Sequence, residues 1–150
     1  MPRFLRCEKG GLAYRISASH SEYEDTGLVA ILAGLAGDRL GEAHERVMAE
    51  LEDLKTHGPT DEEMHRTREF LRGQMLLGLE DSSVRAEWYA KNGLFYEKAQ
   101  TPEERLTAYA QVTPEDIQRL AQSTFDTSRM TVSYIGKESE ASVKTALKLP

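Results

Sequence analysis

The side chains best suited to metal chemistry in this sequence are its four histidines, and their spacing does not fit a zinc peptidase. They are His20, His44, His57 and His65. A helical zinc motif needs two imidazoles one turn apart, and no pair here has that spacing. Cys7 is the only cysteine, so neither an internal disulfide nor a cysteine-based zinc site can form. We therefore predict surface histidines and no metal or other cofactor on this chain.

Two further patterns have structural explanations. Gly34, Gly37 and Gly41 follow an apolar run and precede a helix, but they match neither G-x-G-x-x-G nor G-K-[ST]. Asp38 would also repel a phosphate at that helix start. Most paired carboxylates fall in first turns of predicted helices, where they favour the dipole; they are Glu62/Glu63, Glu80/Asp81, Glu103/Glu104 and Glu115/Asp116. No Ser-His-Asp, Cys-His or Gly-x-Ser-x-Gly arrangement indicates a nucleophile.

The composition is that of one soluble globular domain. The chain has 150 residues, of which 39% are hydrophobic and 29% charged. The net charge of -6 argues against nucleic acid as the main partner. No apolar run approaches the roughly 20 residues of a membrane span, and charges interrupt the start where a secretory signal would be apolar. We expect a cytoplasmic protein with no membrane contact.

Three strands are predicted. Alternation over residues 12–19 indicates a half-buried strand, and the apolar run at 27–33 indicates a strand buried on both faces. The short polar turn between them favours an antiparallel pair. Residues 130–135 alternate again and predict the third strand. Three strands are few for this length, which indicates that partner strands lie in a longer protein or on another subunit.

Helix signals divide the middle of the chain. A helix capped by Asp38 should end at His57-Gly58-Pro59. Later helix starts are marked by caps or capping boxes at Thr60, Asp81, Thr101 and Thr113, two of them followed by proline. The last helix should bury Ile117, Leu120 and Ala121. The order predicts an α+β fold, an antiparallel sheet with helices packed on one face.

Aromatic side chains gather in one segment of the predicted helical region. They are Trp88, Tyr89, Phe95 and Tyr96. Core packing is the first interpretation, and an interface patch is the second. Residues 137–150 have no firm pattern and are predicted to be a tail.

Six phrases, in order over residues 4–136, resemble one known family. They are Cys7–Ile16 (CEKGGLAYRI), His20–Gly27, Leu71–Met75, Leu79–Ala86, Val112–Ile117 and Tyr134–Gly136. Together they resemble the second, C-terminal type of domain in pitrilysin/insulinase zinc peptidases, the inverzincins. The resemblance implies that residues 1–136 form a partial domain of this type, which begins inside the family domain.

The resemblance also implies that zinc binding and substrate binding belong to different domains. In the family the zinc ligands lie in an N-terminal domain with the motif H-x-x-E-H, which this chain lacks, so zinc is expected on a partner domain or subunit. The second-type domain closes over the peptide substrate and supplies a tyrosine and an arginine near the scissile bond. Tyr14 matches that tyrosine, whose phenol could donate a hydrogen bond to the substrate carbonyl or oxyanion. Cys7 occupies the arginine position, and Arg6, one residue away, is the arginine we assign instead.

Two functions from different classes follow. The first is a substrate-binding, transition-state-assisting domain of a zinc-dependent metalloendopeptidase, inactive alone. The alternative is a non-catalytic structural or partner subunit that keeps the peptidase fold; Cys7 favours it, because a thiol cannot replace a guanidinium. An unrelated binding module would require all six phrases to be coincidental. An exposed edge strand also predicts self-association into a homo-oligomer.

Overall fold

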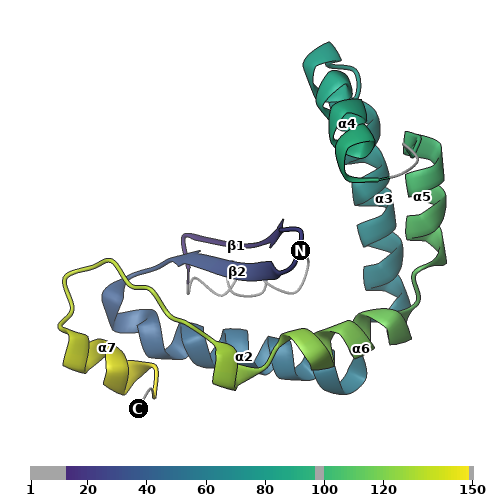
Figure 1. Cartoon of the computed structure of the whole chain (residues 1–150). Helices are drawn as coiled ribbons and strands as arrows, with labels where there is room; N and C mark the ends of the chain where they lie inside the picture. The colour runs from purple at the N-terminus through teal and green to yellow at the C-terminus, as the bar shows by residue number, and fades with distance from the viewer. Residues whose placement is uncertain (1–12, 97–99, 149–150) are drawn as a thin grey trace. The chain divides into compact units, whose positions relative to one another are not determined.

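The computed structural model describes residues 13–96 and 100–148. The fold is α+β, as predicted, with two antiparallel strands and six α-helices in the described residues (Figure 1). The chain divides into two compact units, residues 1–57 with 121–150 and residues 58–120. No helix in the described part of the chain is long and apolar enough to cross a membrane.

A β-hairpin opens the first unit. Strands β1 (Arg15–Glu22) and β2 (Gly27–Gly34) pair antiparallel, with Arg15 opposite Gly34 and Glu22 opposite Gly27. The turn is closed by a hydrogen bond from the Tyr23 amide to the Thr26 carbonyl oxygen, 2.9 Å long. The predicted antiparallel pair is therefore confirmed.

The hairpin packs through one face only. Ala13 and Ile16 are buried, and Ile31, Leu35 and Val47 pack against them. Val47 belongs to α2 (Leu40–His57), which lies along the hairpin in Figure 1.

The prediction that the second strand is buried on both faces is wrong. Leu28 and Leu32 point to the face of β2 opposite Ile31, and Leu32 is 67% exposed. Apolar side chains on both faces are buried only when something packs on both. Among the described residues, packing reaches only the Ile31 side of this strand.

The start of α2 also differs from the prediction. A 3₁₀ turn, η1 (Gly37–Arg39), precedes the helix, with Ala36 at its N-cap and no side-chain cap. Asp38 therefore lies inside the turn, where its charge favours the helix dipole, and is not the cap. The end is as predicted: α2 stops at His57, and Gly58 follows with φ +70°, a conformation that glycine adopts readily.

A short helix lies within the segment for which the sequence gives no pattern. Ser139 caps α7 (Glu140–Ala146) by accepting a hydrogen bond from the Ser142 amide. Val143 and Leu147 are buried. A Cβ on Gly41 of α2 would lie 3.1 Å from the Ala146 carbonyl oxygen, so glycine permits the close approach of the two helices.

The third predicted strand is not formed. After η2 (Thr127–Arg129), residues 130–135 form no helix or strand. A strand exists only with a neighbour to share its backbone hydrogen bonds, and no described segment pairs with this one. The sequence periodicity identified a segment suited to a strand but contained no information on its partner.

The second unit is helical and begins with the predicted capping chemistry. It contains α3 (Asp61–Gly78), α4 (Ser82–Phe95), α5 (Pro102–Gln111) and the first part of α6 (Pro114–Thr124). Thr60 with Glu63 and Thr101 with Glu104 form complete capping boxes, and Asp81 caps α4. Helices α3 and α5 run side by side (Figure 1), and Arg68 of α3 donates to the Val112 carbonyl oxygen at 2.6 Å.

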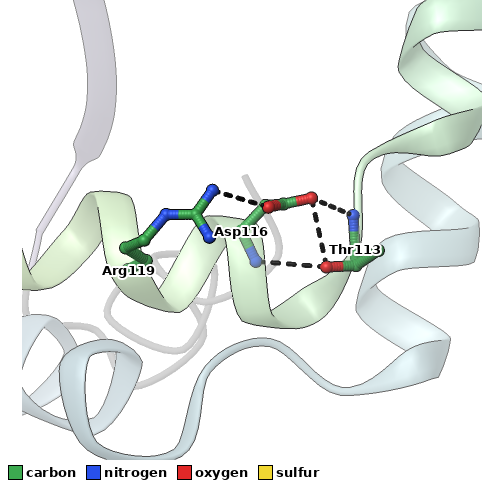
Figure 2. A network of polar contacts seen from close by, with 3 residues as sticks. All are labelled: Thr113, Asp116 and Arg119. Atoms are coloured by element: carbon green, nitrogen blue, oxygen red, sulfur yellow. Dashed lines mark hydrogen bonds and ion pairs between the residues drawn. The ribbon is translucent and has the colours of Figure 1, made fainter.

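The α6 start is built in the same way. Thr113 and Asp116 exchange hydrogen bonds, and Arg119 binds the other carboxylate oxygen of Asp116 (Figure 2). The predicted apolar stripe of this helix is only partly right. Ala121 is buried and Ile117 is half-buried, but Leu120 is mostly exposed because no described side chain covers it there.

Candidate functional site

Tyr14 is the one assigned site residue in the described part of the chain. It lies at a bend just before β1, and its amide donates to the Gly34 carbonyl oxygen at 2.7 Å. Ala13 on one side is buried, and so is Ile16 a little further along. The Tyr14 side chain is 84% exposed. The backbone is thus fixed to the hairpin while the phenol faces outward.

The second assigned residue, Arg6, lies outside the described residues, as does Cys7. The structure therefore does not test whether Arg6 approaches Tyr14. The pairing of the two side chains stays a prediction.

The histidines are dispersed over several elements. His20 on β1 lies 3.5 Å from the carboxylate of Glu22, and His57 at the end of α2 lies 2.8 Å from that of Asp53. The other two are His44 on α2 and His65 on α3. Within the described residues, no three His, Cys, Asp or Glu side chains lie close enough to hold a metal ion. These residues do not fit a zinc site.

Carboxylates line an open depression on α2, together with one arginine and one alanine; the residues are Glu42, Glu45, Arg46, Ala49, Glu50 and Asp53. Lys148 donates to Glu45 at 2.6 Å. That hydrogen bond, with the ammonium charge, holds the pKa of Glu45 below its usual value. Glu45 therefore stays ionised near neutral pH and is unsuited to donating a proton.

The aromatic segment on α4 combines core packing with exposure. Trp88 is half-buried, and its indole N–H donates to the Gln100 carbonyl oxygen at 3.1 Å. The Arg105 guanidinium lies 5.8 Å from the Trp88 ring centroid and 5.7 Å from that of Tyr96. The predicted core packing is right for Trp88, whereas Tyr89, Phe95 and Tyr96 are exposed.

Sequence reasoning missed Asn92, the buried polar residue of this region. It is 4% exposed, its amide group donates to the Trp88 carbonyl oxygen at 2.8 Å, and its side-chain oxygen accepts from the Gln100 amide at 3.4 Å. Asn92 thus ties α4 to the start of the α5 segment. Nothing in the sequence distinguished Asn92 from an exposed asparagine on a helix.

Comparison with known proteins gives the class to which this fold belongs. A family model described as "Peptidase M16 inactive domain" matches residues 3–71. The uncharacterized zinc protease YmxG of Bacillus subtilis is 31% identical over 118 residues, which are 79% of this chain and 29% of that protein. An uncharacterized zinc protease of Streptomyces coelicolor is 31% identical over 137 residues, 90% of this chain and 30% of that protein.

A solved structure agrees. The crystal structure of a conserved protein from Enterococcus faecalis V583 matches with a TM-score of 0.66 and 26% identity, over 79% of this chain and 28% of that one.

These matches define a class of zinc proteases and, within it, a domain type described as inactive. The chain belongs to the M16 peptidase family and is a C-terminal-type, non-catalytic domain of that family. It spans about three tenths of the length of the curated relatives it matches, 29% of one and 30% of another.

Proposed function

We propose that this chain is the substrate-binding, transition-state-assisting part of a zinc-dependent metalloendopeptidase. The observation that carries the proposal is the geometry of Tyr14, a phenol that is 84% exposed on a backbone fixed by its hydrogen bond to Gly34. A phenol hydroxyl that is accessible to a bound peptide can donate a hydrogen bond, and such a donor stabilises negative charge that develops on a carbonyl oxygen. Its target would be the carbonyl oxygen of a bound peptide.

Hydrolysis itself belongs to another part of the enzyme in this proposal. The described residues do not fit a zinc ion, so the metal would be held by a domain or subunit that carries H-x-x-E-H. The metal would supply an activated water there. This chain would hold and orient the peptide, with Tyr14 near the scissile bond and Arg6 beside it, and would not cleave peptides alone.

A chimera tests the role of Tyr14. This chain would replace its matching segment in Bacillus subtilis YmxG, and hydrolysis would be measured on a peptide that unaltered YmxG cleaves. We expect Tyr14→Phe to lower kcat by about 10²-fold, the effect of removing one oxyanion donor. Tyr23→Phe is the matched control, since Tyr23 is an exposed tyrosine in the turn of the same hairpin. Equal kcat values for the two variants would exclude the role for Tyr14.

The alternative, a structural or partner subunit, rests on Cys7 at the family's arginine position. It predicts a different result from the same chimera. Deleting the segment would abolish hydrolysis, yet Tyr14→Phe would leave it unchanged. Restoring the arginine with Cys7→Arg separates the two functions further: it should raise kcat only where this surface contacts the substrate.

The cytoplasmic location and self-association are also proposals. The chain carries -6 net charge, which suits a dissolved protein rather than an anionic membrane surface. Cell fractionation tests the location, and sedimentation at several concentrations tests for a homo-oligomer.

A further inference from the structure

Arg105 of α5 is held against two aromatic side chains from α4 and its C-terminal end. The guanidinium carbon lies 5.8 Å from the centroid of the Trp88 ring and 5.7 Å from that of the Tyr96 ring. Both distances are within the roughly 6 Å over which a ring face attracts a cation. Trp88 is itself held in place, because its indole N–H donates to the Gln100 carbonyl oxygen at 3.1 Å. These contacts restrict where the guanidinium can lie.

The hydrogen-bond donors of this guanidinium have no acceptor in the described part of the chain. The Nε atom of Arg105 is buried without a hydrogen-bond partner, and no described oxygen accepts from the terminal amino groups. A ring face attracts the charge but does not replace an oxygen acceptor. A ligand that brings acceptor oxygens to these amino groups would therefore bind favourably.

The acidic side chains nearest to Arg105 along α4 and α5 are engaged elsewhere or face away. Glu104 closes the capping box of α5, and Glu87 pairs with Lys91 on its own helix. Glu103 lies two positions before Arg105, and side chains at that spacing do not face each other on a helix. Within the described residues, none of these carboxylates occupies the guanidinium.

A carboxylate is the anion that Arg105 fits best. The planar guanidinium can bind both oxygens of a carboxylate through two parallel hydrogen bonds. A phosphate group carries about two negative charges, so the glutamates in the first turn of the same helix would repel it more strongly. Tyr96 is 45% exposed beside Arg105, and apolar groups next to a bound carboxylate can pack on its ring.

We propose that Arg105, together with Trp88 and Tyr96, binds a carboxylate group of a peptide. A peptide is the source that the chain's membership of a peptidase family favours, and it can offer the carboxylate of an acidic side chain or of its C-terminus. The three residues belong to the unit of residues 58–120, whereas Tyr14 belongs to the other unit. The proposal therefore holds whether or not Tyr14 acts on a substrate.

The fluorescence of Trp88, the only tryptophan, reports binding next to Arg105. The 150-residue chain would be titrated with the peptide Ala-Leu-Glu-Leu-Ala, blocked at both ends, and with the same peptide carrying Gln in place of Glu. We expect the Gln peptide to bind at least about tenfold more weakly, because a neutral amide cannot form the charge-assisted pair. The Gln peptide with a free C-terminal carboxylate distinguishes the two sources, and saturable binding of either carboxylate supports the site.

Variants of the chain identify the residue that binds. Arg105→Gln should lower the affinity for the Glu peptide by about tenfold, to that for the Gln peptide. Arg72→Gln is the matched control, since it removes the same charge from an exposed position on α3, and it should leave the affinity unchanged. Arg105→Lys keeps the charge but not the planar fork, so it should retain only part of the binding. The comparison of the two peptides on the unaltered chain needs no variant to fold.

Different results would overturn the proposal. Equal affinities for the Glu and Gln peptides would exclude recognition of a carboxylate, and an equal loss in Arg72→Gln would exclude a specific role of Arg105. Displacement of the Glu peptide by inorganic phosphate at lower concentration than by acetate would make phosphate the preferred anion. Binding that appears only in Glu97→Gln would mean that a carboxylate of the chain itself, outside the described residues, occupies Arg105. Peptide hydrolysis enters none of these readouts, so failure here and failure of the proposed function are distinguishable.

Discussion

The hairpin and the helices of residues 58–120 are stabilised in different ways. Helices α3, α4 and α5 each begin at a side chain that accepts a backbone hydrogen bond two or three residues further on, namely Thr60, Asp81 and Thr101. The hairpin has its own ladder but relies on a small cluster, Ala13 and Ile16 with three half-buried neighbours, to hold its single covered face.

The two regions differ in whether their stabilising contacts lie within a few residues or come from a distant segment. A capping box is complete within four residues, so both of its partners can be read from the local sequence. A sheet face or a strand edge is complete only when another segment arrives, and β2 and residues 130–135 both present apolar side chains that no described segment covers. The stability of the helical unit should therefore depend on substitutions at its helix starts. The stability of the hairpin should depend on the few side chains on its packed face.

The largest effect should come from the packed face of the hairpin. Ile16→Ala removes a side chain that is 6% exposed, and we expect a loss of about 2–5 kcal/mol in the free energy of unfolding, from lost burial and the cavity left behind. Leu32→Ala is the matched control on the opposite face and should change the free energy by less than about 0.5 kcal/mol. Urea unfolding of both variants measures the difference. Similar losses would show that both faces of the hairpin are packed in solution.

The same contrast explains how far the sequence alone could describe the fold. The hairpin, its antiparallel pairing, the end of α2 and the helix starts at Thr60, Asp81 and Thr101 follow from periodicity and capping chemistry within a few residues. The burial of β2 and of Leu120 could not be read from the sequence, because an apolar side chain does not specify which segment covers it. Asp38 was misplaced because a 3₁₀ turn can begin without a side-chain cap.

A second prediction concerns the buried amide that joins α4 to the residues before α5. Asn92→Ala leaves the Gln100 amide without its side-chain acceptor, and we expect a loss of about 1–3 kcal/mol. Lys91→Ala, next to it on the exposed side, removes only a surface ion pair with Glu87 and should cost about 0–1 kcal/mol. Thermal unfolding followed by the fluorescence of Trp88, the only tryptophan, reports on this region. Equal midpoints for the two variants would contradict a structural role for the buried amide.

Only part of the candidate site could likewise be identified from the sequence. Tyr14 was identified by its place in a family phrase, and the structure adds that its backbone is fixed and its phenol exposed. Asn92 belongs to no such phrase, and a lone asparagine on a helix gives no sign of burial before its partners are known. A sequence motif identifies residues with a chemical role in a family. The hydrogen-bond partners of a residue such as Asn92 are known only once the fold is known.

A smaller effect is expected at a helix start. Thr60→Ala removes the acceptor of the Glu63 amide and breaks the capping box of α3, so the free energy of unfolding should fall by about 1 kcal/mol. Thr67→Ala, an exposed site in the interior of the same helix, should be neutral or slightly stabilising, because alanine is the better helix former. Urea unfolding followed by circular dichroism measures both. A loss at Thr67 as large as that at Thr60 would show that the cap does not matter to the helix.

The smallest effect should be a dependence on pH at the start of α6. Hydrogen bonds from the Thr113 amide and hydroxyl, then the Arg119 guanidinium, hold the pKa of Asp116 below its ordinary value (Figure 2). A carboxyl whose pKa is lower in the folded state stabilises the fold in full above the ordinary aspartate pKa of about 3.9. That contribution is lost as the pH falls from there through the lowered pKa, because the unfolded chain takes up the proton first.

Asp116→Asn should therefore weaken the dependence of the unfolding midpoint on pH at acid pH. Glu115→Gln removes a carboxylate from the same first turn but outside this network, and should leave more of that slope in place. If both variants flatten the curve equally, the stabilisation comes from charge near the helix dipole and not from the hydrogen bonds to Thr113.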